Sequence, residues 1–177
     1  MRGFGTMAAV AQRSTLHVSL GAIVGAVAWT ATEYASHRWV LHGPFGTGRL
    51  KRLPLGGLHR AHHRDPNATS LVARSAGHCA VAAAAAVASV GIAAVVPVAA
   101  ARSAAAAFAA GYSTYEINHW NLHHRPARTA RGRHLRVRHD RHHFGAPASN
   151  LGVTSALWDK VFGTEAPATQ TQASAAA

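Results

Sequence analysis

The sequence has few of the residues that build an ordinary soluble core or a disulfide-bonded one. Its 177 residues include a single cysteine, Cys79, so an intramolecular disulfide and a secreted disulfide scaffold are excluded. Aromatic residues make up 7% of the chain and acidic residues number 6, against 18 lysines and arginines and 14 histidines. The apolar content of 49%, with alanine at 41 positions, excludes a disordered basic tail. A membrane protein, a basic nucleic-acid binder and a histidine-rich metal protein remain.

The apolar residues occur in blocks about as long as a bilayer requires, roughly 20 residues. The blocks run from Leu16 to Ala35, from Ser75 to Val96 and from Ser103 to about Tyr115. We expect one spanning helix followed by a helical hairpin, with a soluble alanine-rich helix pair as the alternative for the last two blocks. A cleaved signal peptide is disfavoured, because cleavage would place the following arginine-rich segment outside the cell, against the positive-inside rule.

The basic residues predict the topology of these spans. Fourteen of the 18 lysines and arginines lie between Arg38 and Arg74 or between Arg125 and Arg141, the two segments that flank the expected hairpin. Both segments therefore emerge on one face, which is cytoplasmic by its charge. Such charge also suits nucleic acid, but the segments lack the interleaved aromatic residues of a single-strand platform. We expect no nucleic-acid partner.

Most of the histidines fall into four short groups within or beside these basic segments. In chain order they are His37 with His42, His59 with His62 and His63, His119 with His123 and His124, and His139 with His142 and His143. At about 100° per residue, the i, i+3, i+4 spacing of the second and fourth groups places three imidazoles within an arc of roughly 100° on a helix. One helix face then presents three nitrogen ligands.

The other two groups are less regular. His119 and His123 share a face about 40° wide, whereas His124 points about 140° away from His119, so we favour His119 and His123 as ligands. His37 and His42 also diverge by about 140° on a regular helix. They need a distorted turn or must serve two different metals.

Ten imidazoles exceed what one metal ion can coordinate, so two ions are the economical interpretation. Imidazole suits iron, zinc, copper or nickel. A structural zinc site is disfavoured because Cys79 is the only cysteine. A carboxylate-bridged di-iron bundle is disfavoured because its Glu-x-x-His spacing occurs once, from Glu116 to His119.

Longer motifs surround the four groups: EYASHRWVLHGP, HRAHHRDP, YEINHWNLHH and HLRVRHDRHH, followed by NLGVTSALWDKVFGT from Asn150 to Thr164. In this order they resemble the fatty acid hydroxylase and sterol desaturase superfamily of non-haem di-iron membrane oxidases. The resemblance covers the chain from about Trp29 to Thr164. Bacterial carotenoid hydroxylases share similar histidine motifs and a short length, but their closing segment differs, so they are the alternative.

The resemblance implies an all-α integral membrane bundle of about three spanning helices under a cytoplasmic, histidine-rich helical cap. One domain would cover residues 16–164, between an N-terminal segment, 1–15, and a disordered tail, 165–177. The expected activity is O2-dependent hydroxylation or desaturation of a lipid acyl chain in lipid biosynthesis, at a bacterial-type cell membrane. The partners would be the lipid, the membrane and an external electron donor of the ferredoxin or cytochrome type with its reductase.

The family's ligand set, carried over residue by residue, assigns two iron ions, or zinc in preparations, to ten histidines: His37, His42, His59, His62, His63, His119, His123, His139, His142 and His143. No catalytic residue is expected beyond the metal centre. Four carboxylates near the groups are candidates to orient the ligand rings, and His124 is an additional candidate ligand; the carboxylates are Glu33, Asp65, Glu116 and Asp140. Glu33 has an equal alternative as a helix-end charge at the membrane interface. A non-catalytic histidine-rich membrane metal binder is the alternative of another class.

Overall fold

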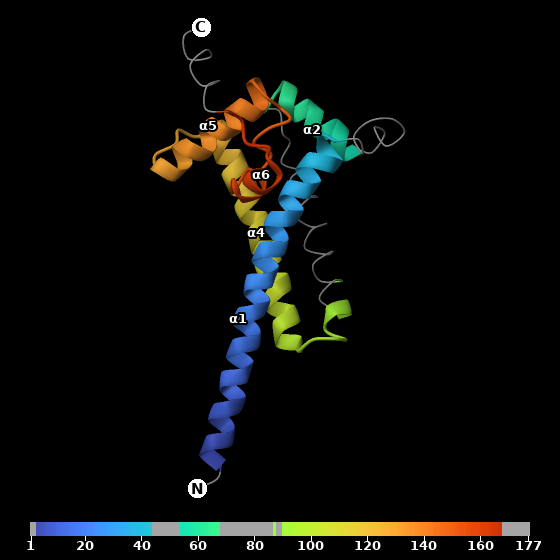
Figure 1. Ribbon diagram of the computed structural model, residues 1–177, viewed down its shortest axis with the longest axis vertical. Helices are drawn as coiled ribbons and strands as arrows, with labels where there is room; N and C mark the ends of the chain where they lie inside the picture. The colour runs from blue at the N-terminus through green and yellow to red at the C-terminus, as the bar shows by residue number, and fades with distance from the viewer. Residues whose placement is uncertain (1–2, 44–53, 68–86, 88–89, 168–177) are drawn as a thin grey trace. The chain divides into compact units, whose positions relative to one another are not determined.

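The computed structural model describes residues 3–43, 54–67, 87 and 90–167, and in this part of the chain it is helical without a β-strand. This confirms the all-α prediction. The elements are α1 (Gly3–Ala35), the π-helix η1 (Ser36–Leu41), α2 (Pro54–Arg64), α4 (Val98–His124), α5 (Ala130–Phe144) and α6 (Leu157–Phe162), as Figure 1 shows. Most of the second expected span, Ser75–Val96, lies outside the described residues.

The helix ends follow local signals in the sequence. The Thr129 side chain accepts a hydrogen bond from the Gly132 N–H at 3.0 Å and so caps the start of α5. α4 ends at His124, two residues before Pro126, whose ring disfavours helical geometry in the residue before it. α6 ends at Gly163, which adopts a left-handed φ of 66° that glycine accepts without strain.

Among the described residues, one helical stretch is long and apolar enough to cross a membrane, from Ala11 to Leu41. Between residues 16 and 27 six large apolar side chains are exposed, namely Leu16, Val18, Leu20, Ile23, Val24 and Val27. Such a continuous exposed apolar surface suits lipid rather than water. The expected third span lies within α4, which does not meet the same criterion. α1 continues without a break across the expected boundary between residues 15 and 16.

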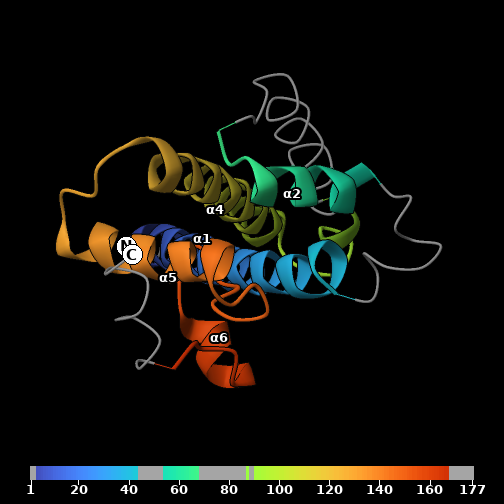
Figure 2. The ribbon, with the colours of Figure 1, turned by 90° about the horizontal axis from the view of Figure 1, so that it is seen from above.

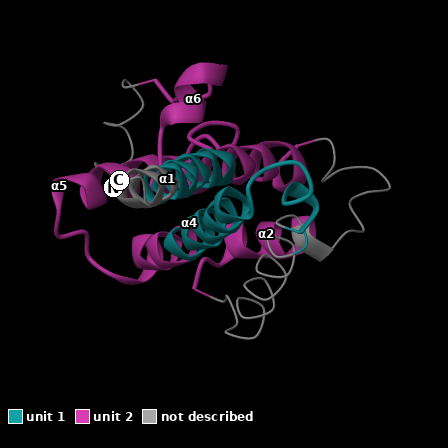
Figure 3. Ribbon diagram, turned by 90° about the horizontal axis from the view of Figure 1, so that it is seen from below, with its two compact units in different colours: residues 1–29, 70–114 teal, residues 30–69, 115–177 magenta. Residues whose placement is uncertain are grey.

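The chain divides into two compact units, residues 1–29 with 70–114 and residues 30–69 with 115–177 (Figure 3). Within the first unit, α1 and α4 approach closely because α1 carries glycine at the contact. A Cβ on Gly25 would overlap the backbone of Ala104, so no larger residue fits there. The ring of Trp29 packs edge-on against Phe108 and Tyr112, each at 5.3 Å between centroids.

The second unit contains η1, α2, α5 and α6 with the adjoining ends of α1 and α4, and Figure 2 shows these elements from above. Leu122, Leu135 and Val153 form its apolar core. α6 is held through Trp158, whose Nε1 donates to Thr30 Oγ1 at 3.1 Å, and through Phe162, whose ring stacks on that of Tyr34 at 5.3 Å. All four histidine groups of the sequence lie in this unit.

Candidate metal centre

Ten histidines of the second unit converge into two groups of five. The first group is His37, His42, His59, His63 and His142, and the second group is His62, His119, His123, His139 and His143. In each group, one ring nitrogen per histidine lies within 4.8 Å of the corresponding nitrogens of the others. These are the same ten residues that the sequence singles out, and His124 is in neither group.

The helices α2 and α5 each contribute to both groups. On α2, His59 and His63 are one turn apart and enter the first group, whereas His62 enters the second. On α5 the pattern is reversed, with His142 in the first group and the one-turn pair in the second. The helix face that the i, i+3, i+4 spacing predicts is therefore divided between two sites rather than presented to one.

A π-helical turn brings His37 and His42 into the same group. In η1 the His42 N–H donates to the His37 carbonyl at 3.1 Å, an i to i+5 hydrogen bond in place of the usual i to i+4. The wider turn reduces the angle between residues five apart, so both rings face the first group. Of the two alternatives that the spacing allowed, the structure has the distorted turn.

The ring nitrogens are arranged as metal ligands rather than as hydrogen-bond partners. In the first group, the Nε2 atom of His59 lies 3.1 Å from that of His37, 2.7 Å from that of His42 and 3.1 Å from that of His63. A neutral imidazole nitrogen offers either one N–H or one lone pair, so it cannot form three hydrogen bonds. Metal–nitrogen bonds of about 2.0–2.1 Å would separate neighbouring ligand nitrogens by roughly 3.0–3.4 Å. The donor set thus fits a metal ion.

The second group has the same character and lies beside the first. The Nε2 atom of His62 is 2.9 Å from that of His119, and the Nε2 atoms of His139 and His123 are also 2.9 Å apart. The rings of His63 and His143, one from each group, stack with centroids 4.1 Å apart and planes 10° from parallel. Two adjacent sites of this kind can hold a pair of metal ions.

Buried nitrogens without a protein partner support this interpretation. Within the described part of the chain, Nε2 of His142 and both ring nitrogens of His143 are buried and have no hydrogen-bond partner. A buried polar atom without a partner is costly unless something else satisfies it. A cation at each group would satisfy one nitrogen of each ring, the one that carries the lone pair.

Burial keeps the imidazoles neutral at physiological pH. Burial, followed by the charges of neighbouring histidines, lowers the pKa of His62 and of His123 from 6.5 to about 4. Burial, followed by the neighbouring charge of His63, lowers the pKa of His42 to about 4 in the same way. The pKa of His143 falls to about 2. Neutral imidazole is the form that binds metal, so the site is prepared for ligation before an ion enters.

The lowered pKa values predict that the metal-free protein loses stability as the pH falls from about 6.5 toward 4. In that range the unfolded chain binds protons that the folded chain excludes, so the free energy of unfolding decreases with decreasing pH. We expect the unfolding midpoint in detergent to drop by more than about 5 °C between pH 7 and pH 5, as a loss of about 2 kcal/mol requires. Circular dichroism melts measure it, and a midpoint that is constant over this range would contradict the prediction.

Backbone carbonyls, rather than carboxylates, hold two rings of the first group from behind. The Nδ1 atoms of His37 and His142 lie within hydrogen-bonding distance of the carbonyl oxygens of Leu151 and Ser149 respectively, the latter at 2.9 Å. These rings therefore carry the proton on Nδ1 and present the Nε2 lone pair to the group. Both carbonyls belong to the segment that follows α5.

Two of the four carboxylates that the sequence offers for this role bond backbone N–H groups. Glu33 is buried and accepts hydrogen bonds from the N–H groups of Val153 and Thr154 at 2.8 and 2.9 Å, so it is neither on a ligand ring nor at a solvated helix end. Asp65 accepts from the Asn67 N–H. Neither histidine group includes Glu116 or Asp140.

The additional candidate ligand, His124, is exposed on α4. Its Nδ1 lies 2.9 Å from the Trp120 carbonyl, and its ring stacks on the Trp120 ring at 4.7 Å. The preference for His119 and His123 over His124, drawn from helix geometry, agrees with this placement.

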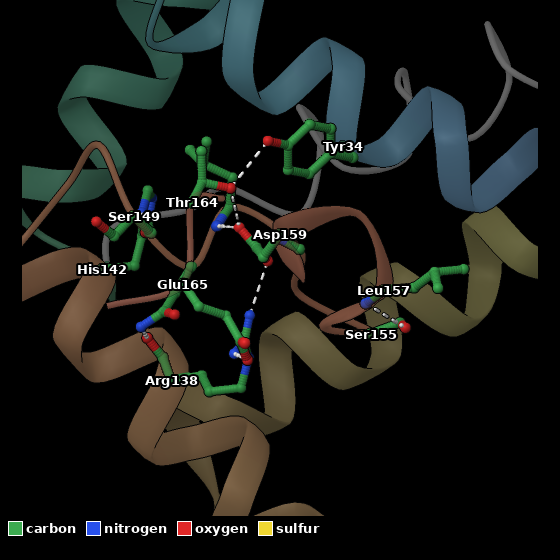
Figure 4. Close-up of polar contacts among 12 residues, drawn as sticks. Tyr34, Arg138, His142, Ser149, Ser155, Leu157, Asp159, Thr164 and Glu165 are labelled. Carbon is green, nitrogen blue, oxygen red and sulfur yellow. Dashed lines mark hydrogen bonds and ion pairs between the residues drawn. The ribbon is translucent and has the colours of Figure 1, made fainter. Parts of the chain in front are cut away.

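Asp159 is a buried acidic residue that the sequence does not indicate as part of the site. Its carboxylate is completely buried and accepts from the N–H groups of Leu151 and Gly152, both at 2.8 Å, and from the Thr164 hydroxyl at 2.7 Å. It also forms an ion pair with Arg138 at 2.7 Å (Figure 4). No spacing rule links these residues, because two of the four partners are backbone N–H groups and the other two come from separate parts of the chain.

The ordered part of the domain extends past residue 164. Arg138 forms a second ion pair with Glu165 at 2.8 Å, and the Ala166 N–H donates to the Asn150 side chain at 3.1 Å. The first two residues of the expected tail are therefore held against the closing segment. Residues 168–177 lie outside the described part.

The described residues combine a helical fold, an apolar helix of membrane-spanning length and two adjacent five-histidine groups that could each hold a metal ion. The chain belongs to the fatty acid hydroxylase family, whose profile matches residues 22–164. This confirms the resemblance drawn from the motifs.

Characterised relatives agree with this assignment. The chain is 31% identical over 151 residues to the dihydroceramide fatty acyl 2-hydroxylase FAH2 of Arabidopsis thaliana, with 82% of this chain and 61% of that protein covered. It is 28% identical over 148 residues to the fatty acid 2-hydroxylase of Rattus norvegicus, with 82% and 39% covered. The chain thus spans at most about three fifths of the length of these relatives. The comparisons give the carotenoid hydroxylase alternative no support.

A solved structure has the same fold. The structure described as full-length scs7p, in which only the hydroxylase domain is visible, matches with a TM-score of 0.65 and 25% identity, covering 86% of this chain and 57% of that one. The ceramide very long chain fatty acid hydroxylase scs7 of Schizosaccharomyces pombe is 44% identical over 57 residues, which cover 32% of this chain and 16% of that protein. The 86% coverage means that the match to the solved hydroxylase domain extends over most of the chain.

Proposed function

We propose that this protein is a membrane-bound, O2-dependent hydroxylase of lipid acyl chains. The observation that carries the proposal is the pair of adjacent five-histidine groups in a chain of the fatty acid hydroxylase family. The ten histidines are the ligands of two iron ions. The relatives named as 2-hydroxylases support attack at the carbon next to the acyl carbonyl.

Two bound iron ions would supply the activation of O2, which side chains alone cannot provide. The overall reaction is RH + O2 + 2e⁻ + 2H⁺ → ROH + H2O, with the electrons from an external donor. The chain's own contribution is to bind and orient. Neutral imidazoles add no negative charge to the metals, and the backbone carbonyls behind His37 and His142 fix the direction of their Nε2 lone pairs.

The membrane arrangement is part of the same proposal. Three helices span the bilayer, of which α1 supplies the exposed apolar surface. The histidine groups lie on the cytoplasmic face, where most of the arginines are, and this places the metals within reach of a soluble electron donor. The small residues of α4, including Ala104, allow close packing of α4 against α1.

Heterologous expression tests the proposal. The full chain is produced in a host that makes no 2-hydroxy fatty acids, together with a ferredoxin or cytochrome donor and its reductase, and grown under 18O2 or 16O2. We expect 2-hydroxy acyl lipids whose added oxygen carries the gas label, and about two iron ions per purified chain. Two bound ions without any hydroxylated or unsaturated lipid would favour the non-catalytic metal binder, and a purified chain that binds no transition metal would overturn both.

A further inference from the structure

The segment between α5 and α6 bonds two rings of the first histidine group. Ser149 and Leu151 accept from the Nδ1 atoms of His142 and His37, both of the first group. For the second group, the Nδ1 atoms of His139 and His143 are buried without a partner within the described residues. The two groups therefore differ in how their rings are held from behind.

The same short segment is clamped from its other side by buried acids. The Leu151 carbonyl accepts from His37 while the Leu151 N–H donates to Asp159, so a single residue links the carboxylate to the ring. Asp159 holds the next N–H, of Gly152, as well. Glu33 holds the two after that, and the four consecutive N–H groups from Leu151 to Thr154 all end on a carboxylate.

Asn150 fixes the turn between the two carbonyls. It is the only described non-glycine residue with a positive φ, 53°, a conformation that asparagine tolerates better than most residues. Its N–H donates to the Thr164 carbonyl at 2.7 Å and its side-chain amide donates to the Arg138 carbonyl. Residues 149–154 thus have little freedom to move the carbonyls of Ser149 and Leu151.

We propose that Asp159 is a positioning residue for the metal of the first group: through the amides of Leu151 and Gly152 it fixes the carbonyl that orients His37. The proposal rests on the proposed metal site. Loss of a group that orients a ligand typically costs 10- to 100-fold in metal affinity. We therefore expect the removal of Asp159 to weaken one of the two sites selectively.

The Asp159→Asn variant tests the proposal, because asparagine has nearly the same volume as aspartate but only one acceptor oxygen in its side chain. All four donors to Asp159 are N–H or O–H groups, and an amide nitrogen cannot accept from any of them. Glu165→Gln is the matched control, since Glu165 is an exposed partner of the same arginine and does not bond the segment. Circular dichroism and size-exclusion chromatography establish that each variant is folded.

The readout is ferrous iron affinity, measured on the full-length chain in detergent under argon with a competing chelator. In a His123→Ala background, which removes a ligand of the second group, Asp159→Asn is expected to lower the affinity for ferrous iron 10- to 100-fold. In a His59→Ala background, which removes a ligand of the first group, Asp159→Asn is expected to change the affinity for ferrous iron less than about threefold. Equal weakening in both backgrounds, or none in either, would overturn the proposal.

A second variant pair covers the case in which Asp159→Asn does not fold. Glu33→Ala removes the acceptor for Val153 and Thr154, whereas in Glu33→Gln one oxygen can still accept both N–H groups. The alanine variant is expected to weaken the first group alone and the glutamine variant to preserve it; identical affinities for the two would contradict the clamp. An unmodified chain that binds no iron would refute the metal site itself, a result separate from all of these.

Discussion

Replacing His59 with alanine is expected to lower hydroxylated lipid by more than about 1,000-fold and to reduce bound iron from two ions per chain to one. His59 is buried, and its Nε2 atom lies within 3.1 Å of the Nε2 atoms of three other histidines of the first group. Its removal takes away the ligand on which the others converge. A single remaining metal cannot carry out chemistry that requires two.

The matched control is His124→Ala, which removes the same side chain from an exposed position outside both groups. This variant is expected to keep both ions and wild-type product levels. Iron is counted by mass spectrometry of purified protein, and product by lipid analysis of the expressing cells. Full activity in His59→Ala, or the same loss in His124→Ala, would contradict the assignment of ligands.

Replacing Arg138 with methionine is expected to lower the free energy of unfolding by about 3 kcal/mol, because removal of one partner leaves a buried charge uncompensated. Arg138 is 6% exposed and pairs with the fully buried Asp159. Methionine retains the apolar stem but no donor. A loss of this size shifts the unfolding midpoint of a domain of this length by roughly 6–12 °C, which thermal melts in detergent can resolve.

The two ion pairs of Arg138 provide the comparison. Glu165→Gln breaks the pair at the exposed side, where Glu165 is 40% accessible, and is expected to cost less than about 1 kcal/mol. Adding Asp159→Asn to Arg138→Met removes the stranded charge, so the double variant should be less destabilised than the sum of the two single changes. Equal losses in the free energy of unfolding for Arg138→Met and Glu165→Gln would show that burial of the ion pair does not determine how much stability its loss costs.

The histidines of both groups could be predicted from the sequence because their spacing is a property of the helix itself. Residues three and four apart lie on one side of a helix wherever that helix packs, so His59, His62 and His63 were identified together. Their division between two groups depends on where neighbouring helices lie, and spacing within one helix does not contain that information. The pairing of His37 with His42 required a π-helical turn, which regular helix geometry could not supply.

The support behind the rings could not be predicted for a different reason. Every residue has a backbone carbonyl, so nothing in the side chains of Ser149 or Leu151 marks them as partners of His142 and His37. Carboxylates near the histidines in sequence were the natural candidates. The structure instead uses Glu33 to hold the backbone of the closing segment. The ion pair of Glu165 is also invisible in the sequence, because its partner, Arg138, comes from a different helix.

The sharing of α5 between the two groups has a consequence for biosynthesis. Both groups take histidines from α5, and the carbonyls that hold His37 and His142 come later still. While the ribosome is making the chain, the first group lacks its fifth histidine until residue 142 has been added, and the second group is incomplete until residue 143 has been added. Neither group can assemble before α5 has been synthesised and has docked. An ion that needs all five ligands of a group can therefore bind only after that point.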